Sequence, residues 1–169
     1  MKFNTLTSIS PIDGRYSDKT SDLKNIFSEF GLIKYRVLVE VRWLQAMSNN
    51  PQISEVGEFD EMTNQSLNAI VDNFSLEDAE AVKNIERTTN HDVKAVEYFL
   101  KDKIIGNTAL EQVSEFIHFA CTSEDINNLS HALMLNDGRT VLVQQMQNLS
   151  DLIADLAKNN AEIPMLSRT

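Results

Sequence analysis

A leucine repeat in the last third of the chain constrains the fold most strongly. Four leucines recur every seven residues and two further apolar residues fill the alternate positions: Leu135, Leu142, Leu149, Leu156, Met146 and Ile153. This spacing is typical of a helix whose apolar face packs in a bundle. A helix from Thr122 to Asn160 would be roughly 55–60 Å long at 1.5 Å per residue, longer than a compact domain of this mass is wide. We therefore expect one long helix that needs partners and that continues through Gly138, where a glycine costs only about 1 kcal/mol against Ala and where any kink would fall.

The rest of the chain also favours helices. Gly and Pro number only 5 and 3, and the prolines at 11, 51 and 164 lie outside the periodic segments. The opening segment to about Tyr16 contains turn dipeptides and is predicted to be a loop. Ser75 and Asp78 are spaced as a capping box at the start of one helix. The predicted shorter helices cover residues 21–49, broken at Gly31, then 58–73, 75–87 and 93–104. The sequence therefore predicts an all-α fold.

The apolar faces of two of these helices can be read directly from the spacing. In the first helix, Val37, Val41 and Leu44 share one face. In the last of the shorter helices, the residues at 93, 96, 100 and 104 share another, and Gly106-Asn107 closes it. We expect both faces to be buried in the core.

Composition and charge limit the partners. Hydrophobic residues make up 42% and charged residues 24%, the balance of a globular protein, and the formal net charge is −10. Such a surface repels nucleic acids and anionic membranes, so neither is a predicted partner and an anionic ligand needs a local basic pocket. The single cysteine, Cys121, cannot form an internal disulfide and fits a reducing compartment. Without a signal-like or membrane-spanning apolar run, the predicted location is cytoplasmic.

The first of three polar clusters is Asp13-Gly14-Arg15-Tyr16. Gly14 allows a sharp turn, which leaves the Arg15 guanidinium free to bind a phosphate or carboxylate. Tyr16 can stack on a ligand or hydrogen-bond to it. The alternative interpretation is an ordinary surface turn.

The second cluster, residues 88–92, stands immediately before the Val93 helix. The exposed N–H groups of a helix start attract an anion, and His91 could hydrogen-bond or exchange protons with a ligand there. Alternatively, Asn90 is simply the N-cap and Asp92 a favourable charge in the first turn.

The third cluster, residues 121–128, opens the long helix and includes the hydroxyls of Thr122 and Ser123. Two hydroxyls at this positive dipole end can donate to a bound carboxylate. Equally, Thr122 can serve only as the cap, with Asp125 as its capping-box partner.

Other site patterns are missing from the sequence. No metal-binding spacing of Cys and His occurs, so no metal site is predicted. His118 and His131 lie in apolar stretches that we expect to be helical, where a histidine is usually a packed and hydrogen-bonded core residue. No glycine-rich phosphate loop or Gly-x-Ser-x-Gly motif is found.

Together the clusters resemble the bacterial adenylosuccinate lyases, a family of the fumarase and aspartase superfamily. The matching strings are SPIDGRY at 10–16, RTTNHDVKAVEYF at 87–99 and SEFIHFACTSEDINN at 114–128. The resemblance covers nearly the whole chain. It implies β-elimination of fumarate from adenylosuccinate, giving AMP, and from the succinylcarboxamide ribotide of purine synthesis (SAICAR), giving AICAR. It implies no metal or organic cofactor.

The resemblance also implies roles for single residues. Arg15 and Tyr16 would contact the nucleotide, with Arg15 at the phosphate. Asn90, His91 and Asp92 would bind substrate, with His91 assisting near the reacting end. Thr122 and Ser123 would donate to a carboxylate of the succinyl group. These seven positions are the candidate site: Arg15, Tyr16, Asn90, His91, Asp92, Thr122 and Ser123.

The family pattern continues after Thr169 with a histidine that acts as the general acid, and further on with a serine that takes the proton. We therefore expect this chain to stop short of its parent protein and to be inactive by itself, because β-elimination needs both an acid and a base. The family is a homotetramer with a central helical bundle. The expected organisation is an amino-terminal helical domain at 1–110 and the start of the central bundle at 111–169. The alternative function is a helical interaction module without catalysis.

Overall fold

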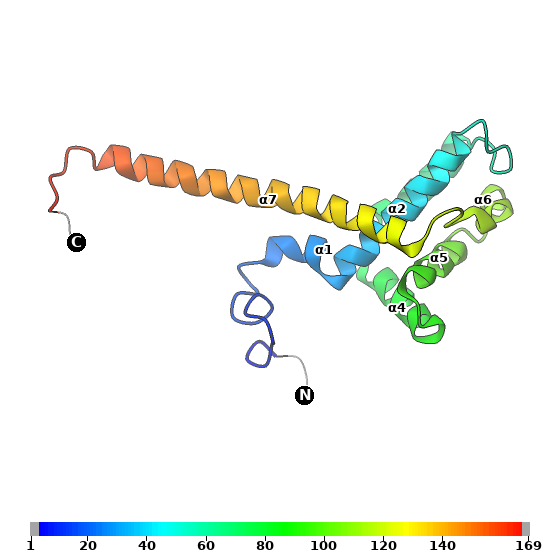
Figure 1. Cartoon of the computed structure of the whole chain (residues 1–169), viewed down its shortest axis with the longest axis horizontal. Helices are drawn as coiled ribbons and strands as arrows, with labels where there is room; N and C mark the ends of the chain where they lie inside the picture. Colours follow the sequence, from blue (N-terminus) through cyan, green and yellow to red (C-terminus); the bar gives the residue numbers. More distant parts are fainter. Residues whose placement is uncertain (1–3, 167–169) are drawn as a thin grey trace.

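The computed structural model describes residues 4–166, and its regular structure in this range is helical, without strands (Figure 1). The elements are η1 (Ser21–Leu23), α1 (Lys24–Phe27), α2 (Glu29–Ser48), α3 (Glu61–Asp72), α4 (Leu76–Thr89), α5 (Asp92–Lys103), α6 (Thr108–Gln112), η2 (Ser114–Phe116) and α7 (Ser123–Asn159). The predicted all-α fold is confirmed. The predicted stop at Thr169 lies outside the described residues. No helix among residues 4–166 is long and apolar enough to cross a membrane.

Helix α2 is the centre of the folded body. It packs against α3, α4, α5 and the first part of α7. The predicted apolar faces are both buried: Val37, Val41 and Leu44 expose at most 2% of their surface, and so do their counterparts on α5. Both apolar faces follow the helical period, and residues from both pack together in one buried core.

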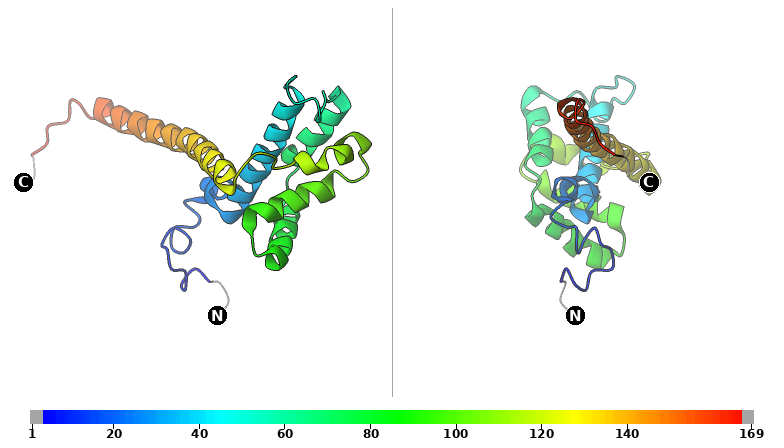
Figure 2. Two further views of the ribbon diagram at one scale, coloured as in Figure 1. Left: turned by 45° about the vertical axis from the view of Figure 1, so that its right-hand side comes forward. Right: turned by 90° about the vertical axis from the view of Figure 1, so that its left-hand side faces the viewer.

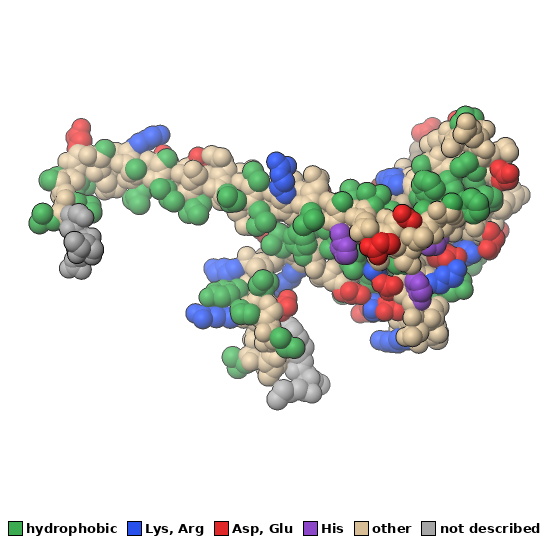
Figure 3. Space-filling view, viewed as in Figure 1, with side chains coloured by type: hydrophobic (Ala, Val, Ile, Leu, Met, Phe, Trp, Pro, Cys, Tyr) green, Lys and Arg blue, Asp and Glu red, His purple; other side chains and the backbone are tan. Residues whose placement is uncertain are grey.

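Helix α7 leaves this body as a single projecting rod (Figures 1 and 2). Only its first half packs on the body, through α1, α2 and α5, and residues 142–166 are exposed throughout. The heptad leucines are therefore open to solvent: Leu135 is 65% exposed, Leu149 59% and Leu156 65%. Figure 3 shows apolar side chains along the lower edge of this rod. The predicted long helix without enough partners is confirmed.

Glycine serves packing at two positions inside helices, and of the two only the predicted break at Gly31 is wrong. Gly31 lies inside α2, and the chain breaks instead at Ser28, whose side chain accepts a hydrogen bond from the Gly31 N–H. A Cβ at Gly31 would overlap the carbonyl oxygen of Ile26, because the backbone of α1 lies close to α2 at this point. Helix α7 continues through Gly138, where a Cβ would overlap the ring of Phe27. Both glycines allow close approach of a neighbouring segment.

The alternative interpretation of Asn90 and the expected placement of two histidines were wrong. Asn90 does not cap α5, because it ends α4 in a left-handed conformation with φ 52°, and the cap of α5 is His91. His118 lies in the turn before α7 with φ 65° and not in a helix, although it is hydrogen-bonded as expected. His131 is on α7 but exposed, because Ser130 and Met134, and not His131, lie on the buried face of the helix. The Ser75–Asp78 capping box is confirmed.

Candidate functional site

The starts of α5 and α7 are joined by one buried arginine of α2. Arg36 is 5% exposed. Its Nη2 donates to Asp92 Oδ2 at 2.6 Å, and its Nε donates to Asn127 Oδ1 at 2.9 Å. A guanidinium can do this because its donors point in fixed, divergent directions. The second and third predicted clusters therefore meet at Arg36.

A small apolar contact lies beside this arginine. Val39, Val93 and Ile126 form a buried cluster, with Cys121 and Leu133 packed against it. Each of the three buried side chains comes from a different helix: α2, α5 and α7. The contact fixes the first turns of α5 and α7 against α2, so the Arg36 hydrogen bonds join helix ends that are already held in place.

At the start of α5, His91 is poised to act as a donor. Its Nδ1 accepts from the Lys94 N–H at 3.2 Å, so the neutral ring carries its proton on Nε2. No residue between 4 and 166 hydrogen-bonds Nε2, and the side chain is 50% exposed. His91 can therefore donate to, or exchange a proton with, a molecule at this helix start.

Asp92 next to it is held ionised. Partial burial opposes ionisation, but the Val93 N–H and the charge and hydrogen bond of Arg36 together outweigh it. The pKa of Asp92 therefore lies below its usual value. Because Asp92 is occupied by Arg36, its part in a site is to fix the helix start next to His91.

At the start of α7, the two predicted hydroxyls differ. The N–H and the hydroxyl of Thr122 both donate to Asp125 Oδ2, at 2.7 and 2.9 Å. These hydrogen bonds lower the pKa of Asp125 and use the Thr122 proton within the chain. Ser123 is only partly exposed, and its hydroxyl has no hydrogen-bond partner among the described residues. Of the two, Ser123 is thus ready to donate to a ligand, whereas Thr122 must first release Asp125.

The first cluster lies apart from the other two. Arg15 and Tyr16 are exposed, and the Arg15 guanidinium stands 5.2 Å from the centre of the Tyr16 ring. Gly14 is needed for the turn, since a Cβ there would come 2.6 Å from the Thr5 carbonyl oxygen. No hydrogen bond or ion pair among residues 4–166 connects this segment to α5 or α7, and Figure 1 shows it beside α1. The structure therefore does not bring Arg15 and Tyr16 to Arg36.

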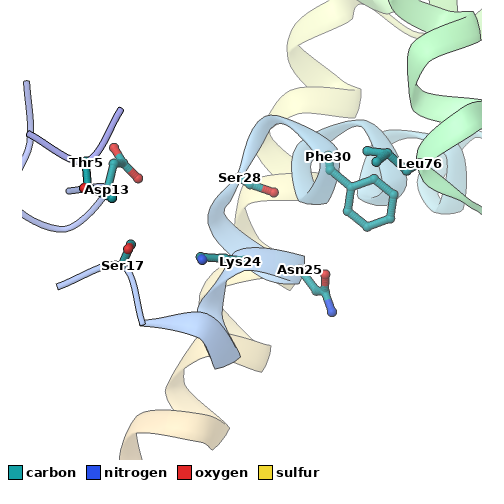
Figure 4. A pocket seen from close by; sticks show the side chains of 8 residues that line it. All are labelled: Thr5, Asp13, Ser17, Lys24, Asn25, Ser28, Phe30 and Leu76. Carbon is teal, nitrogen blue, oxygen red and sulfur yellow. The ribbon is translucent and has the colours of Figure 1, made fainter. Parts of the chain in front are cut away.

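A hollow of about 540 Å³ belongs to this amino-terminal region. Its lining comes from the amino-terminal segment and from the α1–α2 corner, with one residue of α4: Thr5, Asp13, Ser17, Lys24, Asn25, Ser28, Phe30 and Leu76. In Figure 4 the Lys24 side chain extends from α1 toward the segment that carries Ser17. The hollow thus has a basic group but none of the seven predicted site residues. No group of His, Cys, Asp or Glu in the described part of the chain could hold a metal ion.

Sequence reasoning missed Arg36 and gave Asn127 no role. A signal was present, because Arg36 and Glu40 are charged residues four apart in the otherwise apolar middle of α2. Charged residues are rarely buried unless paired, so their position in such a run indicates partners from elsewhere in the fold.

Comparison with known proteins adds to this geometry. A family model described as "Lyase" matches residues 14–169. Three similar curated proteins, each named adenylosuccinate lyase, are those of Vibrio cholerae at 56% identity, Haemophilus influenzae at 59% and Escherichia coli at 58%. Each match covers 100% of this chain but only 37% of the relative, so the chain spans little more than a third of their length.

Proposed function

The chain belongs to the lyase family, and from this premise we propose that it is the amino-terminal part of an adenylosuccinate lyase. The proposed reactions release fumarate from adenylosuccinate, giving AMP, and from SAICAR, giving AICAR. Each elimination breaks a carbon–nitrogen bond while a proton leaves the neighbouring carbon. The high identity to proteins of that name along the whole chain supports the proposal.

The observation that carries the proposal is the joining of α5 and α7 by Arg36. It places the His91 ring and the Ser123 hydroxyl at two helix starts packed on the same face of α2. Helix starts carry a partial positive charge that attracts carboxylates, which the succinyl group supplies. We propose that Ser123, with Thr122 after release from Asp125, binds a succinyl carboxylate. Asn90, His91 and Asp92 would form the opposite side, with Asp92 held by Arg36.

Arg15 and Tyr16 are proposed as nucleotide contacts, with Arg15 at the phosphate. Their exposed position apart from Arg36 fits a site that is completed only in an assembly. The exposed apolar face of α7 supports a homotetramer in which this helix joins a central bundle. We also propose the division into a domain at 1–110 and the beginning of the bundle at 111–169, and a cytoplasmic location without nucleic-acid or membrane partners.

The 169 residues alone are proposed to be inactive. His91 is the only imidazole among the seven candidate-site residues, and one imidazole is poorly suited to serve as both acid and base. We propose that the parent protein supplies the general acid and the general base from residues beyond Thr169.

The test measures fumarate release from adenylosuccinate by the 169-residue chain and by the full-length protein. We expect turnover from the full-length protein and none from the short chain. In the full-length protein, Ser123→Ala and Arg15→Ala should raise KM. Ser150→Ala, an exposed serine further along α7, serves as the control and should leave KM unchanged. Normal turnover and KM in both site variants would instead favour a helical interaction module.

A further inference from the structure

The connector between η2 and α7, residues 117–122, has an unusual backbone. His118 has φ 65° and Ala120 has φ 60°, and neither is glycine. Side chains with a Cβ avoid this left-handed region, and such conformations persist only where the surrounding structure holds them. Backbone outliers of this kind are common near functional sites. Here Thr122 and Ser123 of the candidate site lie two and three residues after Ala120.

Helix α2 holds the connector at two successive residues. Glu40 Oε1 lies 2.6 Å from His118 Nδ1, and the Trp43 Nε1–H donates to the Phe119 carbonyl oxygen at 2.8 Å. Glu40 and Trp43 are three residues apart in the helix, so they project from the same face. One turn of α2 therefore contacts both a side chain and the backbone of the connector through polar atoms.

The nature of Glu40 argues against a role in stability alone. Its side chain is fully buried, and its Oε2 has no hydrogen-bond partner among the described residues. Burial raises the pKa of Glu40 and the Glu97 charge on α5 adds to this, while His118 acts in the opposite direction. Replacing a buried charge by an apolar residue of similar volume is often neutral or stabilising. A carboxylate at position 40 is therefore best explained by what it does to His118.

We propose that Glu40 and Trp43 are positioning residues: they hold the connector in its left-handed form and so set how Thr122 and Ser123 meet the substrate carboxylate. This inference rests on the proposed function for its substrate. Phe119 lies between the two left-handed residues. Its carbonyl group cannot rotate without breaking the hydrogen bond from Trp43, so this contact fixes the orientation of the connector backbone.

The test compares Glu40→Leu and Trp43→Phe with Ser48→Ala in the full-length protein. Leu fills the volume of Glu40 without its hydrogen bond, and Phe retains the aromatic ring but lacks the N–H donor. Ser48 is buried on the same helix and accepts from the Phe59 N–H at 2.7 Å, and it forms no hydrogen bond with the connector among the described residues, so its variant controls for lost stability. Glu40→Gln is the rescue variant, because its amide oxygen can still accept from His118 Nδ1–H.

Two measurements are made on each variant. Hydrogen exchange should become faster at the connector amides of Phe119 and Cys121, which are hydrogen-bonded to Phe116 and His118 in the wild type. KM for adenylosuccinate should rise about tenfold with kcat within about twofold, since the lost interaction positions the bound substrate. Ser48→Ala should change neither quantity, and Glu40→Gln should stay close to the wild type.

The two proposals fail in different ways. Unchanged exchange at Phe119 and Cys121 in both Glu40→Leu and Trp43→Phe would overturn the positioning role whatever the activity. An equal rise of KM in Ser48→Ala would also overturn it, because general destabilisation would then explain the effect. Absence of fumarate release from the wild-type full-length protein would overturn the proposed function, while the exchange comparison would still decide whether α2 holds the connector.

Discussion

Arg36 Nη2 lies 2.6 Å from Asp92 Oδ2, although the two residues are 56 positions apart in the chain. The guanidinium is buried, whereas 44% of the Asp92 side chain is exposed. A buried arginine keeps its charge, so its hydrogen bonds must all be provided by the fold. The pair therefore fixes the start of α5, with His91, against α2.

Removal of this arginine tests its role. Arg36→Met keeps the apolar stem but leaves Asp92 and Asn127 without their donor, so we expect the free energy of unfolding to fall by about 2 kcal/mol. Urea unfolding measures the change. Arg42→Met is the matched control on the same helix, because Arg42 is exposed, and it should cost less than about 0.5 kcal/mol. Equal losses in both variants would contradict a special role for Arg36.

The two helical glycines are predicted to respond differently to alanine. Gly31→Ala places a methyl group against the backbone carbonyl of Ile26, which cannot turn away. The clash should outweigh the gain of about 1 kcal/mol in helix propensity and lower stability by about 1–2 kcal/mol. Gly138→Ala meets only the tip of Phe27, whose side chain is 45% exposed and can rotate, so it should change stability by less than about 1 kcal/mol. Thermal unfolding of both variants gives the comparison, and a larger loss at Gly138 would refute it.

Acid should weaken the start of α4 through Asp78. Burial opposes its ionisation, but the hydrogen bonds from Lys103 and Ser75 outweigh this and hold the pKa of Asp78 below its unfolded value of 3.8. A lowered folded pKa means that the stabilisation is present above pH 3.8 and is lost as the pH falls through the folded value. As the pH is lowered below about 4, the free energy of unfolding should therefore decrease less steeply in Asp78→Asn than in the wild type.

Urea unfolding at a series of pH values below 5 measures this difference. Asp72→Asn is the control, because Asp72 forms no side-chain hydrogen bond or ion pair among the described residues, and it should retain the wild-type pH dependence. An identical slope in the wild type and Asp78→Asn would show that the Lys103 and Ser75 contacts do not stabilise the ionised form.

The exposed face of α7 should make the 169-residue chain self-associate. Sedimentation at tens of micromolar, where weak interfaces form, should show species larger than a monomer. Leu149→Asp places a charge in the heptad face, where Leu149 is 59% exposed, and should reduce association. Ser150→Asp adds the same charge on the next residue, off the heptad positions, and should leave association unchanged. A wild-type chain that sediments as a clean monomer would contradict an interacting face.

Much of the fold follows from local pattern. The longer helices α2, α3, α4, α5 and α7 and the Ser75 capping box were predicted because they depend on spacing, helix propensity and residues that contact their near neighbours. The short helix α6 was not predicted. The misplaced features, the Gly31 break and the Asn90 cap, have another cause. At Gly31, a segment that packs against α2 from outside the helix requires the glycine. At Asn90, the end of α4 and the start of α5 compete for adjacent residues, so Asn90 ends α4 and His91 caps α5.

The candidate site divides in the same way. The sequence by itself determined which polar clusters stand at helix starts, because capping and the helix dipole act within a few residues. Only the tertiary structure decided that two of the three clusters meet at Arg36 and that Glu40 contacts His118 across 78 positions. It also decided that, within residues 4–166, the Thr122 hydroxyl is hydrogen-bonded to Asp125 whereas the Ser123 hydroxyl has no partner. These contacts depend on how α2, α5 and α7 cross, and that geometry is set by the burial of apolar faces over the whole core and not by any local pattern.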